Sequence, residues 1–267
     1  MIDTTSSFTA TFIYLATQKG GYWLLTFASL SVMYCYGISD KSMLWKVMLI
    51  NGLSGLTAIT IQEIYQAKRL CCSTEKWAFL LFINEIFWII HEITTVMYSL
   101  FKVEILLNQE RKRMVRYMMF GLSILYTITR FILGYVRFEE DTLVGTRINQ
   151  IQSYSYLIWL LADLLLLILL SYSIYLHMNS THQKTWEMIV TLSYSSIPRL
   201  LIIMLTTLMI VFLCQSPGSL DSDVLRLAWA IKSGFPFILL LDIHITKDLL
   251  IQHTSSNPLQ YHFGNKK

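Results

Sequence analysis

The feature that most constrains this chain is a series of apolar segments, each long enough to cross a lipid bilayer as a helix. They lie near residues 20–38, 44–65, 77–101, 114–136, 152–177, 187–213 and 224–246. A helix needs about 20 apolar residues to cross the hydrocarbon core, and isolated strands cannot satisfy their backbone groups in lipid. The sequence therefore predicts an all-α fold, a polytopic membrane protein with a seven-transmembrane helix bundle. Six spans is the competing count, because the first two segments are the weakest.

The composition favours lipid as the solvent for much of the surface. Charged residues make up 14% of the chain, whereas soluble domains carry about 25%. The first twenty residues lack a basic start before an apolar run, so no cleaved signal peptide is expected. We expect one transmembrane domain over residues 1–250 and a short cytosolic C-terminal tail over 251–267. The lipid bilayer is the expected partner, and no nucleic-acid partner is expected.

Lysine and arginine residues in the connections predict the orientation of the bundle. More of them fall on the side that holds the C-terminus, largely because of the segment ERKRMVR at 110–116. Cytosolic loops of membrane proteins carry the excess of positive charge. We therefore expect the N-terminus outside and the C-terminus in the cytosol, in the plasma membrane rather than an internal membrane.

The third apolar segment carries ionisable residues that lipid does not tolerate cheaply. Glu85 and Glu92 are seven residues apart and share a helical face with Trp88, and His91 belongs to an adjacent polar stripe. A charged side chain at the bilayer centre costs about 2.5–3.5 kcal/mol on insertion scales. This polar face should therefore point into the bundle. His91 alone is better explained as a hydrogen-bonded interior histidine than as a metal ligand.

Other spans supply charged partners of both signs, namely Arg130, Asp163, Arg199 and Lys232. An unpaired buried charge is the costly case, so a balanced set is what a polar interior requires. Two interpretations stay open: a ligand-binding cavity open to the outside, or interhelical bonds that fix the packing. In the first, the candidate ligand-binding residues are Glu85, Trp88, His91, Glu92, Asp163, Arg199 and Lys232.

Three further features lead to expectations about local structure. Asp242 and His244, near the end of the last span, are expected in a solvated helix end. Pro198 and Pro236 should bend the last two spans, because proline removes a backbone hydrogen bond. A disulfide from Cys71 or Cys72 to Cys214 is one arrangement that the outer loops allow.

The layout of seven helices, an outer N-terminus and two proline-bearing final helices resembles that of G-protein-coupled receptors and of seven-span membrane proteins of early-diverging fungi. The receptor signatures acid-Arg-Tyr and Asn-Pro-x-x-Tyr are not present. The resemblance implies signal transduction: a small-molecule or peptide ligand binds from outside, and a cytosolic G protein or other effector responds near residues 111–116.

A local resemblance leads to a different function. The segments AIKSGFPFILL at 230–240 and YSSIP at 194–198 are similar to the last two helices of microbial rhodopsins. This resemblance implies that Lys232 binds retinal as a Schiff base, with Glu85 or Glu92 as its counterion, although Ala228 stands where that family has an aspartate. A proton- or ion-linked transporter is the other alternative. An enzyme is not expected, since the His-x-x-x-His pair of seven-span zinc hydrolases is missing, and the receptor reading needs no cofactor.

The sequon Asn179-Ser180-Thr181 tests the predicted orientation. It falls in a loop that we place in the cytosol, so it should remain unmodified when the protein is made in a glycosylating host. The measurement is the electrophoretic mobility of the protein before and after glycosidase treatment. A mobility shift that depends on Asn179 would invert the topology.

Overall fold

The computed structural model describes residues 8–18, 20–39, 42–71, 77–105, 107–178, 183–215 and 223–244. Within these ranges the chain is helical and contains no strand. The sequon at 179–181, Cys72 and the tail 251–267 lie outside them. The helices are α1 (Phe8–Gln18), α2 (Gly20–Ile38), α3 (Met43–Cys71), α4 (Phe79–Ile105), α5 (Gln109–Glu140), α6 (Thr146–Met178), α7 (Gln183–Gln215) and α8 (Asp223–Ser233), after which Phe235–His244 is again helical.

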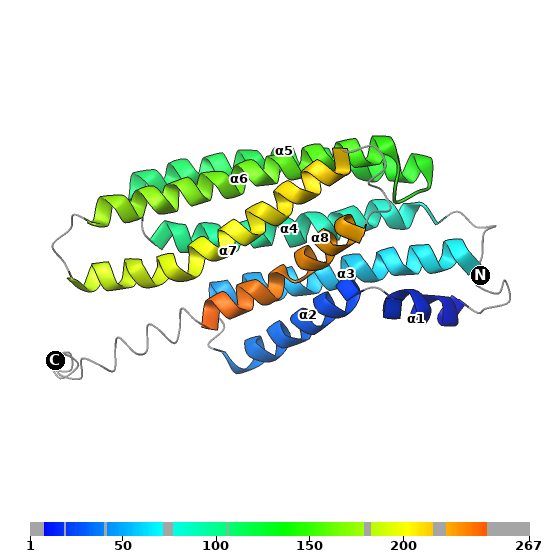
Figure 1. The fold of residues 1–267 in the computed structure, drawn as a ribbon, viewed down its shortest axis with the longest axis horizontal. Coiled ribbons are helices and arrows are strands. Elements are labelled where there is room, and N and C mark those ends of the chain that lie inside the picture. The colour runs from blue at the N-terminus through cyan, green and yellow to red at the C-terminus, as the bar shows by residue number, and fades with distance from the viewer. Residues whose placement is uncertain are drawn as a thin grey trace.

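The helices from α2 to α8 form a closed ring in chain order. Figure 1 shows them from the side, running lengthwise along the long axis of the molecule. Each helix packs against the next, and α8 returns to pack against α2. α4 also contacts α6 and α7, so one face of it looks toward the inside of the ring. α1 packs against α3 and α2. The polar face predicted for residues 83–95 thus belongs to the helix with the most neighbours across the bundle.

Five of these helices are long and apolar enough to cross a membrane: Met43–Cys71, Phe79–Glu104, Gln109–Glu140, Thr146–Tyr175 and Ser196–Gln215. The pair Leu227–Ser233 and Phe235–His244, bent by 41° at the break, gives a sixth span if it counts as one. The chain is therefore a multi-pass, all-α membrane protein with five or six spans among the described residues. The seven-span prediction is not confirmed, although a helix lies over each of the seven predicted ranges.

The outward faces of the helices are strongly apolar, as a lipid-facing surface requires. Trp23 and Phe27 on α2, Phe120 on α5, and Leu161 and Ile168 on α6 are all more than half exposed. The charged side chains in the middle of the spans, Glu85, Glu92, Arg130, Asp163 and Arg199, are buried inside the bundle. The arrangement is inverted relative to a soluble bundle, because the solvent around most of the helix length is hydrocarbon.

Local capping fixes both ends of α5. The Asn108 side chain accepts a hydrogen bond from the backbone N–H of Arg111 at 3.1 Å and so caps the start of the helix. At the other end Asp141 adopts a left-handed conformation with φ 47°, a known way to end a helix. The Tyr65 hydroxyl of α3 donates to the carbonyl oxygen of Asp141 at 2.8 Å. This contact holds the α5–α6 connection against α3.

The predicted bend near Pro236 is present and coincides with the break at Gly234. The Gly234 N–H donates to the carbonyl of Ile231 at 2.9 Å, which closes a tight turn. Pro236 has no N–H to continue the α-helical ladder across this turn. Pro198 lies inside α7, which runs as a single helix through it. Cys214 is a buried free thiol, so no disulfide joins it to the end of α3.

Two glycines allow α4 to approach its neighbours closely. A Cβ atom on Gly55 of α3 would lie 2.7 Å from the His91 Nδ1 atom. A Cβ atom on Gly134 of α5 would lie 3.0 Å from the Glu85 Cγ atom and 3.3 Å from the Phe82 ring. Both distances are too short for a side chain, so these positions bring the backbones of α3 and α5 onto the polar face of α4.

Substitution of Gly134 tests this close packing. We expect Gly134→Val to lower the free energy of unfolding by about 1–3 kcal/mol, because the added side chain must push Glu85 and its helix away from α5. Gly121→Val on the same helix is the matched control, since a Cβ atom there has no neighbour within 4 Å. Unfolding by SDS in detergent micelles measures both, and equal effects of the two substitutions would contradict the packing argument.

Candidate functional site: buried ion pairs and the pocket beside them

Glu85 binds two arginines of α5 at one end of the ring. Its Oε2 atom lies 2.5 Å from Arg130 NH2, and its Oε1 atom accepts from Arg137 NH1. Arg137 NH2 also donates to the Gln152 Oε1 atom of α6 at 3.1 Å. Arg130 and Arg137 are seven residues apart, as are Glu85 and Glu92, so both helices present one stripe to the other. Gly134 lies between the two arginines and makes room for the carboxylate.

Glu92 lies about two helical turns after Glu85 on α4. It forms a second ion pair, with Lys232 of α8. Its other oxygen accepts a hydrogen bond from the Trp159 indole N–H of α6 at 3.0 Å. The Lys232 ammonium also lies 3.6 Å from the centroid of the Tyr156 ring and 5.4 Å from that of Trp229. A cation over an aromatic face is attracted by the ring quadrupole. Lys232 is thus enclosed by a carboxylate and two aromatic rings.

Asp242 organises a third group of charges toward the other end of the bundle. Its carboxylate lies 2.8 Å from Lys102 Nζ of α4, accepts from Arg199 NH1 of α7, and accepts from the Tyr98 hydroxyl at 3.0 Å. Asp242 is only 3% exposed, so the prediction that it sits in a solvated helix end is wrong. His244 is exposed. The segment Phe235–His244 turns Asp242 inward, where two cations compensate its charge.

Asp163 lies buried on α6, one turn from Trp159. Within the part of the chain that the structure describes, no cation comes within ion-pair distance of it. Its carboxyl interacts at longer range with Glu92, Arg199 and Lys232. The predicted acids Glu85 and Glu92 therefore have cation partners within ion-pair distance, whereas the predicted acid Asp163 has none among the described residues. Arg199 pairs with Asp242 in place of Asp163.

His91 ties α4 to α3 through a reciprocal pair of hydrogen bonds with Asn51. The His91 ring Nδ1 lies 2.9 Å from the Asn51 carbonyl oxygen, which can only accept, so Nδ1 carries the proton. The Asn51 side-chain amide donates to the His91 carbonyl at 2.6 Å and to Thr95 Oγ1 at 2.8 Å. Among the described residues, no three His, Cys, Asp or Glu side chains are placed to hold a metal ion.

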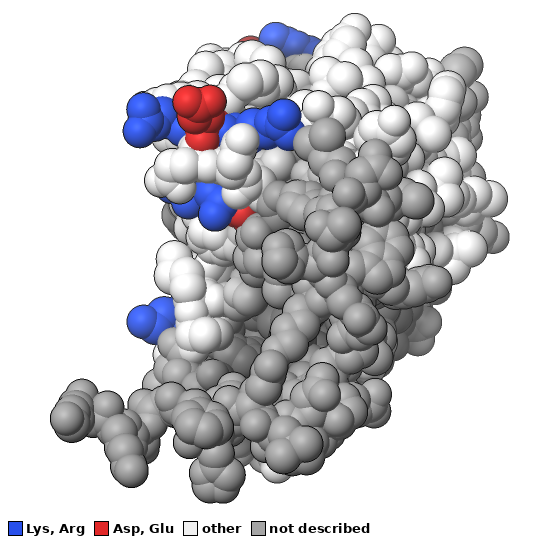
Figure 2. Space-filling model, turned by 90° about the vertical axis from the view of Figure 1, so that its left-hand side faces the viewer, with Lys and Arg blue, Asp and Glu red and all other residues white. Residues whose placement is uncertain are grey.

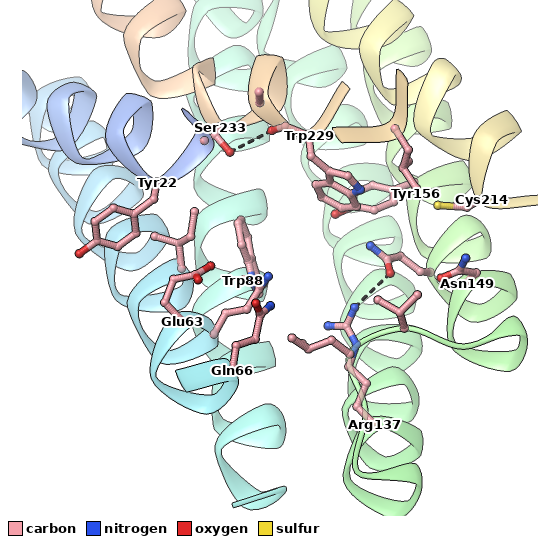
Figure 3. Close-up of a pocket in the computed structure, with 18 of the residues that line it drawn as sticks. Tyr22, Glu63, Gln66, Trp88, Arg137, Asn149, Tyr156, Cys214, Trp229 and Ser233 are labelled. Atoms are coloured by element: carbon pink, nitrogen blue, oxygen red, sulfur yellow. Dashed lines mark hydrogen bonds between the residues drawn. The ribbon is translucent and has the colours of Figure 1, made fainter. Parts of the chain in front are cut away.

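A pocket of about 780 Å³ lies beside the Glu85 group of charges. α7 ends and α8 begins near the level where α2 begins, whereas α5 and α6 extend further toward their connecting turn (Figure 1). The pocket is lined by residues of this region from α2 to α8 and from the α5–α6 connection. Figure 3 shows Glu63 and Gln66 of α3 on one side and Arg137 and Asn149 on the other.

Of the seven candidate ligand-binding residues, Trp88 is the one that lines this pocket. Glu85 and Lys232 do not line the pocket but contact residues that do, and Glu92 pairs with Lys232 behind them. Arg130 and Arg137, which bind Glu85, line the pocket directly, as do the rings of Tyr156 and Trp229 that cover Lys232. Part of the predicted set therefore lies just behind a pocket whose surface is made largely by other residues. His91 packs against the Trp88 ring at 5.5 Å between centroids, Asp163 does not line the pocket, and Arg199 belongs to the Asp242 group.

The apolar run that predicts the fourth span ends at residue 136, so the sequence alone predicts Arg137 in the outer connection that follows it. α5 continues to Glu140, which places Arg137 inside the bundle with 7% of its surface exposed. The i, i+7 spacing of Arg130 and Arg137, matching that of Glu85 and Glu92, is the signal that could have found it. No comparable signal marks Gln152, Tyr156 or Trp229, whose roles depend on how α6 and α8 are rotated.

Comparisons with protein-family models, curated proteins and solved structures find no match to this chain. The geometry of the pocket and of the three charge groups therefore carries the functional argument.

The Glu92–Lys232 pair can be tested with a double-mutant cycle. Each single substitution, Glu92→Gln or Lys232→Met, leaves one buried charge unpaired and should lower the free energy of unfolding by about 3–5 kcal/mol. The double variant should lose clearly less than the sum, because no isolated charge remains. Arg147→Gln, in an exposed pair with Glu139, is the control and should change stability by about 0.5 kcal/mol or less. Additive losses in SDS unfolding would show that the two side chains act independently.

Proposed function

We propose that this chain is a seven-helix membrane receptor that binds a small-molecule or peptide ligand in the pocket of about 780 Å³. The observation that carries the proposal is the position of this pocket, enclosed by residues from every helix of the ring at one end of the bundle. Its volume lies within the range of about 300–1,000 Å³ that is typical of small-molecule sites. Aromatic walls with a few converging polar groups are the usual composition of such sites.

In this proposal α2 is the first of seven spans, and the pocket opens to the outside. α2 closes the ring between α3 and α8, and its outward side chains Trp23, Phe27 and Tyr34 are apolar or aromatic, as lipid contact requires. The proposal takes the N-terminus to be outside and the C-terminus to be in the cytosol, and the excess of positive charge in the connections on the C-terminal side supports this orientation. With this orientation, in the plasma membrane, the pocket faces the extracellular medium.

α8 offers a route from the pocket to the cytosolic half of the bundle. Leu225, Trp229 and Ala230 of α8 line the pocket, and Lys232, one turn further, pairs with Glu92. Beyond the 41° bend, Asp242 contacts α4 and α7. A ligand that shifts α8 therefore acts on both ionic contacts, and it changes the equilibrium only if it binds one arrangement better than the other.

The cytosolic partner would meet the basic start of α5. Arg111, Lys112, Arg113 and Arg116 follow one another there, and Arg116 is held in place by a two-pronged ion pair with Glu104 of α4 at 2.6 and 2.7 Å. Figure 2 looks at this end of the bundle and shows Lys and Arg side chains gathered along one of its edges. Such a surface suits a G protein or another effector with acidic groups, and also anionic lipid headgroups.

The residues around Lys232 do not fit a retinal Schiff base. Retinal needs an elongated apolar cavity that reaches the lysine nitrogen. The Lys232 side chain is 3% exposed and does not line the pocket. Its ammonium pairs with Glu92 and lies against the Tyr156 ring. Retinal therefore has no part in the proposed function.

The receptor proposal predicts a ligand-dependent response that a blocked pocket abolishes. In cells that carry a proximity reporter between this protein and heterotrimeric G proteins, a library of metabolites and short peptides should yield a compound that recruits the G protein. Ala230→Trp, which places an indole in the pocket, should remove the response to that compound. Leu161→Trp, on a lipid-facing position that is 51% exposed, is the control and should preserve it.

A response that survives Ala230→Trp in full would place the ligand elsewhere. Flux of protons or ions through proteoliposomes, with no G-protein recruitment across the library, would favour the transporter alternative and contradict reception.

A further inference from the structure

One corner of the pocket has an excess of positive charge. Arg130 and Arg137 both line it, and both pair with Glu85. Among the described residues, Glu85 is the only carboxylate within ion-pair distance of either guanidinium. Two cations thus share one anion, and the group carries one net positive charge. An uncompensated charge in a low-dielectric interior is unfavourable by several kcal/mol, so the group attracts an anion.

Both arginines also have donors to spare. The Nε atoms of Arg130 and Arg137 are buried and have no hydrogen-bond partner among the described residues. Only a small part of each side chain reaches the pocket surface, since Arg130 is 2% exposed and Arg137 is 7% exposed. A guanidinium binds carboxylates and phosphates with two parallel N–H donors, which gives both strength and direction. Asn149 and Gln152 of α6 line the same corner and add neutral polar groups.

The rest of the pocket surface favours a flat apolar body. Trp88, Tyr22, Tyr156 and Trp229 line it, and the Tyr156 and Trp229 rings meet edge to face at 5.6 Å between centroids. Aromatic walls of this kind pack well against another ring. Glu63 lines the wall of α3, across the pocket from Arg137 (Figure 3). The two guanidinium groups lie on the α5 side of the pocket, so an anion that binds them lies toward α5 and α6.

We propose that the pocket binds a small organic monoanion, a carboxylate with an aromatic or similarly flat apolar body, whose carboxylate contacts Arg130 and Arg137. This inference rests on the proposed function only in taking the pocket as the ligand site, and it adds the chemical class of the ligand. The anion completes the charge balance that Glu85 alone leaves unfinished. The bound anion also lies between α8, which contributes Trp229, and the pocket wall formed by α5 and α6.

Three probes of nearly equal shape test the charge preference: 3-phenylpropanoate, 3-phenylpropanamide and 3-phenylpropylamine. Binding to the full-length protein in detergent is followed by the shift in thermal unfolding temperature and by tryptophan emission excited at 295 nm. We expect the carboxylate to bind about tenfold to a hundredfold more tightly than the amide, the range that charge-assisted hydrogen bonds supply. The amine should bind most weakly. Equal binding of acid and amide, tighter binding of the amine, or no binding of any probe would overturn the proposal.

Substitutions separate the arginines from the general shape of the pocket. Arg137→Gln should remove most of the preference for the acid over the amide and leave amide binding within about twofold, which also shows that the pocket is intact. Arg137→Lys keeps the charge without the fork and should give an intermediate preference. Arg147→Gln removes the same charge from an exposed position and should change neither affinity. Retention of the full preference in Arg137→Gln would overturn the assignment.

If the cell-based screen yields a cationic or neutral ligand that Ala230→Trp blocks, the receptor proposal stands and the anion proposal fails. The two proposals can therefore fail separately.

Discussion

The compensation of buried charge governs the rest of this structure. A carboxylate or guanidinium inside a helix bundle in lipid loses most of the water that would solvate it, and a nearby opposite charge offsets that loss. Glu85, Glu92 and Asp242 each meet this requirement with cations from other helices. The helices must therefore turn their polar stripes inward and hold fixed rotations. The apolar residues that remain on the outer faces then form the surface that lipid covers.

The three acids also join helices that lie far apart in the chain. Glu85 links α4 to α5, and Glu92 links α4 to α6 and α8. Asp242 links the helical segment Phe235–His244 to α4 and α7. α4 takes part in all three groups. Hydrogen bonds such as that between Asn51 and the His91 carbonyl add α3 to the same helix. α4 is thus the polar helix that connects the ring, and the pocket lies at the end of the bundle where α2 and α8 begin.

Much of the fold could be predicted from the sequence, because the apolar segments are long and the spacing of Glu85 and Glu92 defines one face. Helices lie over every predicted range, and the predicted charges are buried. Which charges pair could not be predicted. Arg199 lies with Asp242 because the helix break at Gly234 and the length of α7 set their relative depth, and no sequence pattern gives that depth. Arg137 entered the bundle because α5 extends beyond the apolar run that marked its end.

The ionic contacts also impose an order on assembly. Glu85 and its arginines lie on consecutive helices, so they can neutralise each other as soon as α5 follows α4 into the bilayer. Glu92 sits on the same α4 but depends on Lys232, which is synthesised about 140 residues later, and chains emerge from the N-terminus at a limited rate. During that interval the Glu92 carboxyl must be neutralised by a proton or by another cation, or it must remain in contact with water. Insertion of α8 therefore completes the ionic contacts of the nascent bundle. A chain truncated before α8 keeps Glu92 without its partner Lys232.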